Sequence, residues 1–469
     1  MYHVFKRLLA IGILFASWAS CASAEQFDPS FNGTGRSLEI GSGPNRSPIA
    51  LLERPDGRLV QISYAVGTSC GPMYACPRLT YFNQAGQPTI AYDPLGFDFE
   101  FLSAAAIDSQ GRLILVGTSG LPSPTGRNFR VMRLLITNGP ALDSSFGTNG
   151  AIDINFFGNN DYANAVAIDA DDNILVVGEV GRTAPDTDFG IAKILASNGT
   201  LDTGFGVGGK RTIAFDLSSP ERDSARAVAI SPSGDRITIV GNAYDSAISG
   251  YKVAMTRLTR NGIMDTTLCP GSCTIQGNYA AWNSGRRVYY FGANTAHQDF
   301  AYDLAVLGSG DFFVVGVTDS IDGMTERAAI ARFYANGDYY AETLNSGLGT
   351  QAGYNTVQVS DATGERVLVG GGSGPFGNSN LVLQAFNPDL TLMTGYGDCL
   401  NTTAICFHGG PGTTDYEDRA EQLTLDHLGR PLFAGVVVPS IGSWGSAMFA
   451  RFTNDTGPKP DRIFRNGFQ

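Results

Sequence analysis

Seven short apolar segments recur along this chain, each preceded by a turn and most of them ending in glycine, and this repetition constrains the fold more than any other feature. Their last residues lie 54, 61, 63, 75, 54 and 65 positions apart. That spacing is too long for one coil of a solenoid but suits a four-stranded sheet with its loops. The sequence therefore predicts an all-β, seven-bladed β-propeller of four-stranded antiparallel blades. The segments are RLVQIS (58–63), RLILVG (112–117), NILVVG (173–178), RITIVG (236–241), FFVVG (312–316), RVLVG (366–370) and RPLFAG (430–435).

The repeating unit is clearest between Ala151 and Gly209. There the segments AIDINF, ANAVAIDA, NILVVGEV and FGIAKILA are separated by Gly, Asn and Asp clusters, so we expect them to form the four strands of one blade. The segment ILVVG is apolar at successive positions, which indicates that both faces of the strand are buried between neighbouring blades.

Two turn phrases accompany these strands. A hairpin turn with glycine at its fourth position precedes the apolar segment, as at 108–111 and 426–429, and glycine supplies the positive φ that such turns need. The phrase Leu-Asp-x-x-Phe-Gly-x-x-Gly follows the third strand at 142–150 and 201–209. In this order the phrase resembles the delta-60 repeat, a bacterial β-propeller repeat of largely undefined function. The resemblance covers essentially 27–457 and implies a propeller, but it transfers no catalytic residue.

The two ends of the chain carry complementary halves of one unit. Residues 27–35 (FDPSFNGTG) are the end phrase of a unit whose beginning is absent, whereas the last unit stops at 450–457 (ARFTNDTG) without an end phrase. Propellers commonly close their ring with such a split blade, because open ends would leave unpaired edge strands. We therefore expect 35–40 to form the outer strand of the seventh blade, within a propeller domain of 25–457.

Residues 1–24 read as a signal peptide, with a basic start, an apolar core and the small-residue cleavage site Ala22-Ser23-Ala24. A lipoprotein acylated on Cys21 is the alternative, but Trp18 stands where a lipobox usually has leucine. The tail 458–469 resembles a short C-terminal signature of exported proteins in some Gram-negative bacteria, and a final strand of the ring explains it equally well. These features predict a secreted or periplasmic protein of a Gram-negative bacterium.

The cysteines outside the leader fall in close pairs. The chain has 7 cysteines, and Cys21 lies within the leader. An even remainder in an exported chain favours disulfides over metal sites, because an oxidising compartment preserves the bonds. We expect three local disulfides, which pin loops rather than hold the fold together. They are Cys70 with Cys76, Cys269 with Cys273, and Cys399 with Cys406.

Charge and hydropathy narrow the range of partners. The chain carries 32 basic and 44 acidic side chains, a formal net charge of −12. Such a surface repels phosphate backbones, so nucleic acid is not an expected partner. After the leader, no apolar run approaches the roughly 20 residues that span a bilayer. We expect a monomer that binds an unknown protein or glycan.

Few residues suggest chemistry. His297 and Asp299 could act as an acid and base at the mouth of the ring, although two solvated loop residues explain them as well. Asp169, Asp171 and Asp172 crowd one hairpin turn and could offer oxygens to Ca²⁺, although Asp169 occupies the ordinary turn position of the repeat. No other cofactor is expected.

One face of the ring is predicted to carry the function. Connections between the second and third strands and between successive units vary in length, and variable loops on a rigid scaffold are where specificity is usually built. They include 179–188, 216–224, 292–299 and 436–446, and the last of these contains Trp444, an exposed-aromatic candidate for ligand binding. The first interpretation is a secreted binding or scaffold module. The alternative is a secreted hydrolase or lyase with its site at the mouth of the central channel, and the sequence leaves catalysis open.

Overall fold

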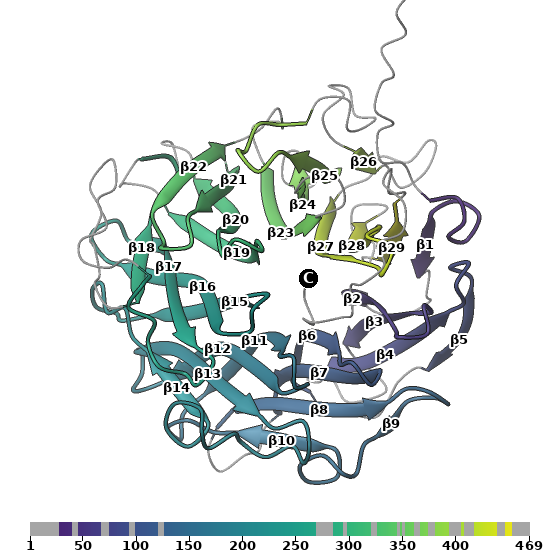
Figure 1. The fold of residues 1–469 in the computed structure, drawn as a ribbon, viewed down its shortest axis with the longest axis horizontal. Helices are drawn as coiled ribbons and strands as arrows, with labels where there is room; N and C mark the ends of the chain where they lie inside the picture. Colours follow the sequence, from purple (N-terminus) through teal and green to yellow (C-terminus); the bar gives the residue numbers. More distant parts are fainter. Residues whose placement is uncertain are drawn as a thin grey trace, which may run out of the picture.

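The chain forms a ring of seven β-sheets around a central axis, and the sheets radiate outward like blades (Figure 1). The structure is a computed structural model. It describes residues 28–39, 46–66, 75–92, 99–120, 126–268, 285–293, 298–319, 326–344, 348, 352–360, 366–373, 380–393, 405–407, 417–438 and 446–452. The all-β seven-bladed propeller predicted from the repeat is confirmed.

Each blade is a four-stranded antiparallel sheet whose first strand lies innermost. Blade 1 consists of β2 (Arg46–Glu53), β3 (Leu59–Val66), β4 (Ala75–Phe82) and β5 (Pro88–Tyr92). Blade 2 consists of β6 (Phe101–Ile107), β7 (Arg112–Thr118), β8 (Phe129–Leu135) and β10 (Ala151–Ile154), and β9 (Ala141–Leu142) also pairs with β8. Blade 3 consists of β11 (Asp161–Ile168), β12 (Ile174–Gly181), β13 (Thr187–Ile194) and β14 (Lys210–Ile213). Blade 4 consists of β15 (Asp223–Ile230), β16 (Arg236–Asp245), β17 (Gly250–Thr259) and β18 (Arg286–Tyr289).

The remaining three blades complete the ring. Blade 5 consists of β19 (Asp299–Val306), β20 (Phe312–Asp319), β21 (Glu326–Phe333) and β22 (Tyr339–Leu344). Blade 6 consists of β23 (Ala352–Ser360), β24 (Arg366–Ser373), β25 (Asn380–Phe386) and β26 (Ile405–Phe407). Blade 7 consists of β27 (Glu417–Leu425), β28 (Pro431–Val438), β29 (Ser446–Arg451) and β1 (Arg36–Glu39), so its outer strand comes from the opposite end of the chain.

The boundary of the third blade differs from the one predicted. The segment AIDI, expected to open blade 3, is β10, and it pairs with β8 as the outer strand of blade 2. Blade 3 instead starts at Asp161 and takes Lys210–Ile213 as its fourth strand. The repeat period alone does not determine the phase at which a blade begins, which is why the sequence placed this strand one blade too far along.

The hydrophobic core lies between the blades. Each second strand is buried almost throughout, as in β12, because both of its faces are covered by neighbouring sheets. The clusters accordingly mix residues of adjacent blades; one combines Val116 and Val131 of blade 2 with Val166 and Val176 of blade 3. Full burial of such an aliphatic side chain contributes about 1.5–3 kcal/mol, so the packing between blades is the main source of stability.

In six blades a glycine lies opposite a β-bulge of the innermost strand, and in blade 1 Ser63 takes that place. In blade 3 the pairing shifts between Ala163 and Ala165, and Gly178 lies opposite the bulge. A Cβ on Gly178 would come within 2.0 Å of the Tyr162 carbonyl oxygen. The same bulge occurs in all seven blades. In blade 6 the glycine with this role is Gly371, where a Cβ would lie 1.8 Å from the Gly353 carbonyl oxygen.

The aspartate of the Leu-Asp-x-x-Phe-Gly phrase forms a buried ion pair. Asp143 Oδ2 accepts a hydrogen bond from Arg133 Nε on β8 at 2.8 Å, and Arg133 is 1% exposed. The Arg133 guanidinium also donates to the Ala196 carbonyl in the next blade. Asp265 and Arg257 repeat the pair in blade 4 at 2.8 Å. In blades 2 and 4 the phrase therefore joins the third strand to its own turn and links it to the following blade.

An ion pair of the same kind, between Asp28 and Arg451, helps to close the ring. β1 pairs with β29 in register from Arg36 opposite Ala450 to Glu39 opposite Ala447. Asp28 Oδ2 accepts from Arg451 Nε at 2.8 Å, and Arg451 also donates to the Gln84 carbonyl of blade 1. The prediction that 35–40 supplies the outer strand of the seventh blade is confirmed.

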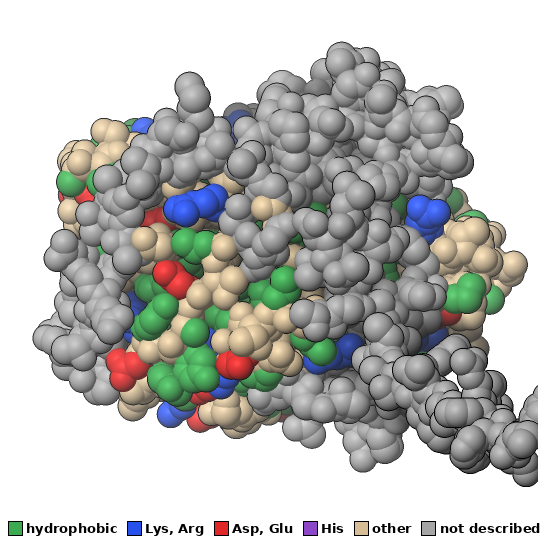
Figure 2. Space-filling view, turned by 90° about the horizontal axis from the view of Figure 1, so that it is seen from above, with side chains coloured by type: hydrophobic (Ala, Val, Ile, Leu, Met, Phe, Trp, Pro, Cys, Tyr) green, Lys and Arg blue, Asp and Glu red, His purple; other side chains and the backbone are tan. Residues whose placement is uncertain are grey.

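The outer side of the ring is chemically mixed. On the side seen in Figure 2, hydrophobic, acidic and basic side chains are interspersed over the described residues that face the viewer. Exposed large hydrophobic residues such as Val207 and Ile263 are individual side chains on separate turns. Within the described residues, no helix is long and apolar enough to cross a membrane.

Candidate functional site

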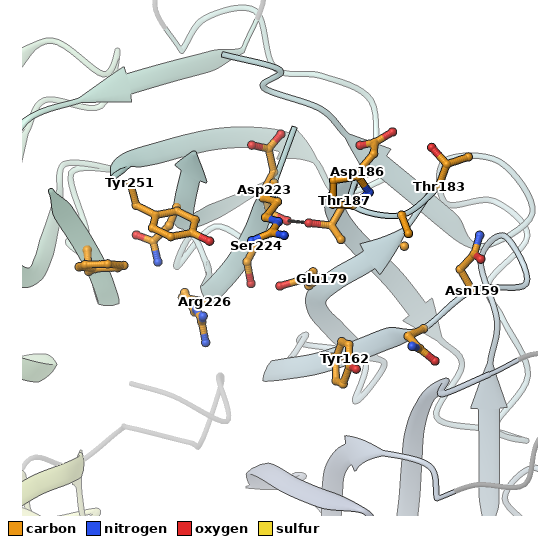
Figure 3. Close-up of a pocket in the computed structure, with 17 residues that line it drawn as sticks. Asn159, Tyr162, Glu179, Thr183, Asp186, Thr187, Asp223, Ser224, Arg226 and Tyr251 are labelled. Carbon is orange, nitrogen blue, oxygen red and sulfur yellow. Dashed lines mark hydrogen bonds between the residues drawn. The ribbon is translucent and has the colours of Figure 1, made fainter. Parts of the chain in front are cut away.

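A cavity of about 590 Å³ opens between blades 3, 4 and 5 (Figure 3). Its walls come from the beginnings of the innermost strands β11, β15 and β19, from the ends of β12 and β16, and from the connection that follows β12. Both 179–188 and 216–224, two of the variable connections identified in the sequence, contribute lining residues. The cavity therefore lies on the face of the ring where the variable loops gather.

Three aromatic side chains line the cavity from different blades. Tyr162 lies on β11, Tyr251 on β17 and Phe300 on β19, and all three are half-buried. The Tyr251 and Phe300 rings lie 5.4 Å apart between centroids at 41°, which joins blades 4 and 5 by an aromatic contact. The Arg127 guanidinium lies 5.8 Å from the centroid of the Tyr162 ring. The half-buried rings offer apolar surface to a ligand.

Glu179 lies near the middle of the cavity, with Arg226 and Tyr251 on one side and Asp186 on the other (Figure 3). It follows the repeat glycine Gly178 on β12, and its backbone pairs with that of Tyr162. Burial raises the pKa of Glu179 above its ordinary 4.5, although the Ser224 hydroxyl and the Arg226 charge favour the ionised form. A carboxyl group with a raised pKa in a cleft is a candidate proton donor or acceptor.

Asn242 occupies the corresponding position after the repeat glycine in blade 4. Its side chain is 2% exposed and lines the cavity. The Asn242 Oδ1 atom accepts a hydrogen bond from the Ala301 backbone N–H at 2.8 Å. The buried Nδ2 atom has no hydrogen-bond partner among the described residues. Arg222 and Arg226 add exposed guanidinium groups to the same cavity.

Three carboxylates gather at the rim of the cavity. Asp186, Asp188 and Asp216 each offer an oxygen, and these atoms lie within 4.8 Å of one another. Arg182 Nε lies 3.5 Å from Asp188 Oδ2 and partly balances their charge. Burial raises the pKa of Asp188 to about 6, and Asp186 and Asp216 add like-charge repulsion. Among the described residues, this group is the one that could hold a divalent cation.

Buried aspartates recur at the first position of the innermost strands and serve the fold. Asp161 accepts hydrogen bonds from the backbone N–H groups of Phe156 and Gly181, at 3.0 and 3.2 Å. Asp223 accepts from the Phe215 N–H at 2.5 Å. Burial raises the pKa to about 6 for Asp161 and to about 7 for Asp223. Each carboxyl group thereby holds the connection that enters its blade.

Asp299, proposed from the sequence as one half of an acid–base pair, is the corresponding residue of blade 5. It is fully buried at the start of β19, and its Oδ2 lies 3.7 Å from Lys252 Nζ. Burial raises the pKa of Asp299 to about 7, while Lys252 opposes the shift. Its position is therefore a buried strand and not a solvated loop. His297, the proposed partner, lies outside the described residues.

The three aspartates proposed for Ca²⁺ have separate protein partners. Asp169 accepts backbone N–H bonds from Asp171 and Asn173 and pairs with Lys193 at 2.9 Å, so it is the turn residue that the repeat predicts. Asp172 accepts from the Ser109 N–H and hydroxyl. Asp171 lies 3.5 Å from Arg260. The three carboxylates therefore interact with different neighbouring residues.

Several predicted residues cannot be placed. Trp444 lies outside the described residues, as do the signal peptide 1–24 and the tail 458–469. At least one cysteine of every predicted pair is also outside them, although Cys76 is buried on β4. The disulfides and the ligand role of Trp444 therefore stay predictions.

Sequence reasoning placed two connections that line the cavity, 179–188 and 216–224, on the functional face, but it singled out none of their residues for binding. One usable signal existed, because the position after the repeat glycine is polar in blades 3 and 4, as Glu179 and Asn242, but valine in blades 5 and 7, as Val317 and Val436. Blade 2 also has a polar residue there, Thr118, so the signal is a charged or amide side chain at this position and not polarity alone.

Comparison with known proteins supports the fold without assigning a family. No protein-family model matches the chain, and no curated protein matches its sequence. The chain is similar to a polysaccharide lyase, an ulvan lyase solved with a glucuronate–rhamnose-3-sulfate ligand, at 11% identity and a TM-score of 0.51, covering 90% of this chain and 100% of that one. It is also similar to the β-propeller domain of the trilobed protease from Pyrococcus furiosus, at 8% identity and a TM-score of 0.43, covering 89% and 98%. The delta-60 resemblance stays a prediction.

Proposed function

We propose that this chain is an exported, saccharide-binding β-propeller and that the sugar binds in the cavity between blades 3, 4 and 5. The observation that carries the proposal is the combination of aromatic rings and polar side chains on the walls of that cavity. Sugar rings present apolar C–H faces and a rim of hydroxyl groups. Tyr162, Tyr251 and Phe300 suit the faces, and the amides and charged groups suit the hydroxyls.

The size and charge of the site support a small polar ligand. A cavity of about 590 Å³ falls within the range of roughly 300–1,000 Å³ typical of small-molecule sites. The net charge of −12 disfavours nucleic acid. A flat apolar patch would favour a protein partner, whereas this site is concave and largely polar. Export, which would expose the protein to extracellular glycans, rests on the expected signal peptide.

Cleavage of the bound saccharide is the second candidate function, and Glu179 favours it. Its raised pKa makes it suitable for proton transfer, and it lies beside Tyr162 and Arg226 in the cavity. The ulvan lyase, similar to this chain in fold alone, illustrates that a propeller of this kind can carry a polysaccharide site. In this case the cavity would be the active site of a lyase or hydrolase.

The binding proposal is tested by calorimetric titration of the purified protein with a panel of oligosaccharides. Tyr162→Ala and Tyr251→Ala should each weaken binding roughly 2- to 12-fold, because each ring removed is worth about 0.5–1.5 kcal/mol of stacking. Tyr340→Ala is the matched control, because Tyr340 is an exposed tyrosine on the outer strand of blade 5. Binding that survives both cavity variants, or that Tyr340→Ala weakens equally, would refute the location.

Catalysis is tested separately with Glu179→Gln. A lyase produces an unsaturated sugar that absorbs ultraviolet light, and a hydrolase produces new reducing ends. If Glu179 transfers the proton, the Gln variant should bind the saccharide but release no product. If wild-type protein binds the saccharide and releases neither product, the chain is a binding module alone.

A further inference from the structure

We propose that the ligand of the cavity is a polysaccharide chain, and that a row of aromatic rings between blades 4 and 5 binds its consecutive sugar units. This inference rests on the proposed saccharide-binding function and adds the length of the ligand and a binding surface beyond the cavity. The aromatic row consists of Tyr244, Tyr251, Phe300 and Tyr302.

The rings of the aromatic row follow one another in single file. Tyr244 near the end of β16 and Tyr251 near the start of β17 lie 5.4 Å apart between ring centroids. Tyr251 lies 5.4 Å from Phe300 at the start of β19, and Phe300 lies 6.4 Å from Tyr302 on the same strand. The row therefore begins on two strands of blade 4 and ends on the innermost strand of blade 5, which borders the central channel (Figure 1).

The aromatic row does not belong to the hydrophobic core between the blades. The core clusters and the partly buried residues packed against them include tyrosines such as Tyr290, but no member of the row. Tyr244, Tyr251 and Phe300 are half-buried, and Tyr302 is 38% exposed. The rings thus pack on one another near the surface. Exposed apolar side chains that are in contact are typical of an interaction site, unlike side chains scattered singly.

The repeat does not require an aromatic residue at Tyr302. The pairing of β19 shifts between Ala301 and Asp303, so Tyr302 is the extra residue of the β-bulge. The innermost strands of the other six blades carry the same bulge, and none of their extra residues is aromatic. Packing within the repeat therefore does not explain this ring. The extra residues of those blades are Ile49, Ser103, Asn164, Arg226, Asn355 and Glu421.

The aromatic row extends beyond the cavity. Tyr251 and Phe300 line the cavity, whereas Tyr302 lies outside its lining. Tyr251 lies on the opposite side of the cavity from Asn159, so the row leaves the cavity on the Tyr251 side (Figure 3). A pyranose ring is about as wide as an aromatic ring, so each ring stacks on one sugar. A ligand that contacts the whole row must therefore be a chain.

The shape of the aromatic row favours a glycan chain over a protein partner. A protein interface of standard size buries about 800 Å² on each partner, which is far more than a file one ring wide provides. A sugar chain is equally narrow, and its hydroxyl groups suit the polar side chains of the adjoining cavity. The tyrosine rings add hydroxyl groups of their own at the edge of the row.

The test measures affinity against chain length. The probes are cello-, manno- and xylo-oligosaccharides and alginate oligosaccharides of two to six sugars. The hexasaccharide of one series should bind at least about fivefold more tightly than its disaccharide, because it covers more rings. Phe300→Ala should weaken both lengths roughly 2- to 12-fold. Tyr302→Ala should weaken the hexasaccharide by the same factor and leave the disaccharide unchanged, since two sugars suffice to cover Tyr251 and Phe300.

Tyr334→Ala is the matched control. Tyr334 is a 43% exposed tyrosine of blade 5 whose ring contacts that of Tyr340 at 5.1 Å, outside the aromatic row. Equal affinity for short and long oligomers, or a hexasaccharide affinity that Tyr302→Ala lowers no more than Tyr334→Ala, would overturn the polysaccharide inference and leave saccharide binding in the cavity intact. Absence of binding to every sugar would overturn the proposed function together with the inference. Circular dichroism of each variant separates a loss of binding from a loss of fold.

Discussion

One buried carboxylate, that of Asp28, strengthens the closure of the ring beside the β1–β29 pairing. It accepts hydrogen bonds from Arg451 Nε at 2.8 Å and from Arg430 Nη1 at 2.9 Å, and its other oxygen accepts from the Ser30 backbone and hydroxyl. Arg451 is 2% exposed. Asp28→Ala removes all four bonds and leaves the buried guanidinium of Arg451 without its carboxylate.

The expected loss is about 3 kcal/mol of unfolding free energy. Removing one partner of a buried ion pair typically costs about 3–5 kcal/mol, because the remaining charge stays desolvated. We take the lower end, because Arg451 keeps bonds to the Gln84 carbonyl and the Ser30 hydroxyl. Arg430 is less affected, since it retains its bond to Asp426 at 2.6 Å.

The assay is urea unfolding combined with hydrogen exchange of β1 and β29. Asp143→Ala is the matched control, because it breaks the equivalent bond to Arg133 inside blade 2, away from the seam. Both variants should lower the unfolding midpoint, but only Asp28→Ala should release protection in residues 36–39. If Asp28→Ala stays within about 0.5 kcal/mol of wild type, or if β1 keeps its protection, the pair does not close the ring.

The same contact has a defined pH dependence. Burial on its own would raise the pKa of Asp28, but the Ser30 hydroxyl and the Arg451 charge hold it below its ordinary 3.8. Because the folded-state pKa is the lower one, the stabilisation is present above pH 3.8 and is lost as the pH falls through the folded-state pKa. The difference between wild type and Asp28→Ala should therefore shrink below about pH 4.

Three further outcomes are expected. Gly178→Ala should destabilise the protein by several kcal/mol on urea unfolding, because the new Cβ would lie 2.0 Å from the Tyr162 carbonyl oxygen. Gly308→Ala is the control and should have little effect, because its Cβ would have no atom within 4 Å. Equal effects of the two variants would contradict the bulge argument. Burial raises the pKa of Asp161 to about 6, so ionising this carboxyl group destabilises the folded state. The melting temperature should therefore fall as the pH rises from about 4 through 6. Asp161→Asn should flatten this dependence on pH. Deleting 27–40 should expose β29 and promote aggregation measurable by light scattering, and unchanged solubility and melting temperature would count against the split blade.

The architecture could be predicted from the amino-acid sequence, because the same unit recurs along the chain. Seven apolar segments at similar spacing predicted seven blades, and the complementary phrases at 27–35 and 450–457 predicted the split one. The apolar segments and the end phrases are short runs of neighbouring residues, and similar runs recur along the chain. An error at one repeat, such as the assignment of AIDI to blade 3, moves one strand without changing the ring.

The cavity and its chemistry arise from the packing of different blades against one another. Tyr162, Asn242 and Phe300 occupy ordinary positions of three different repeats, and they form one site because blades 3, 4 and 5 pack side by side. Likewise, Asp28 and Arg451 stand at opposite ends of the chain, and their bond exists once the ring has closed. Sequence periodicity reports how each strand packs within its blade, whereas a binding site depends on contacts between blades, and those contacts are made by residues that no local pattern links.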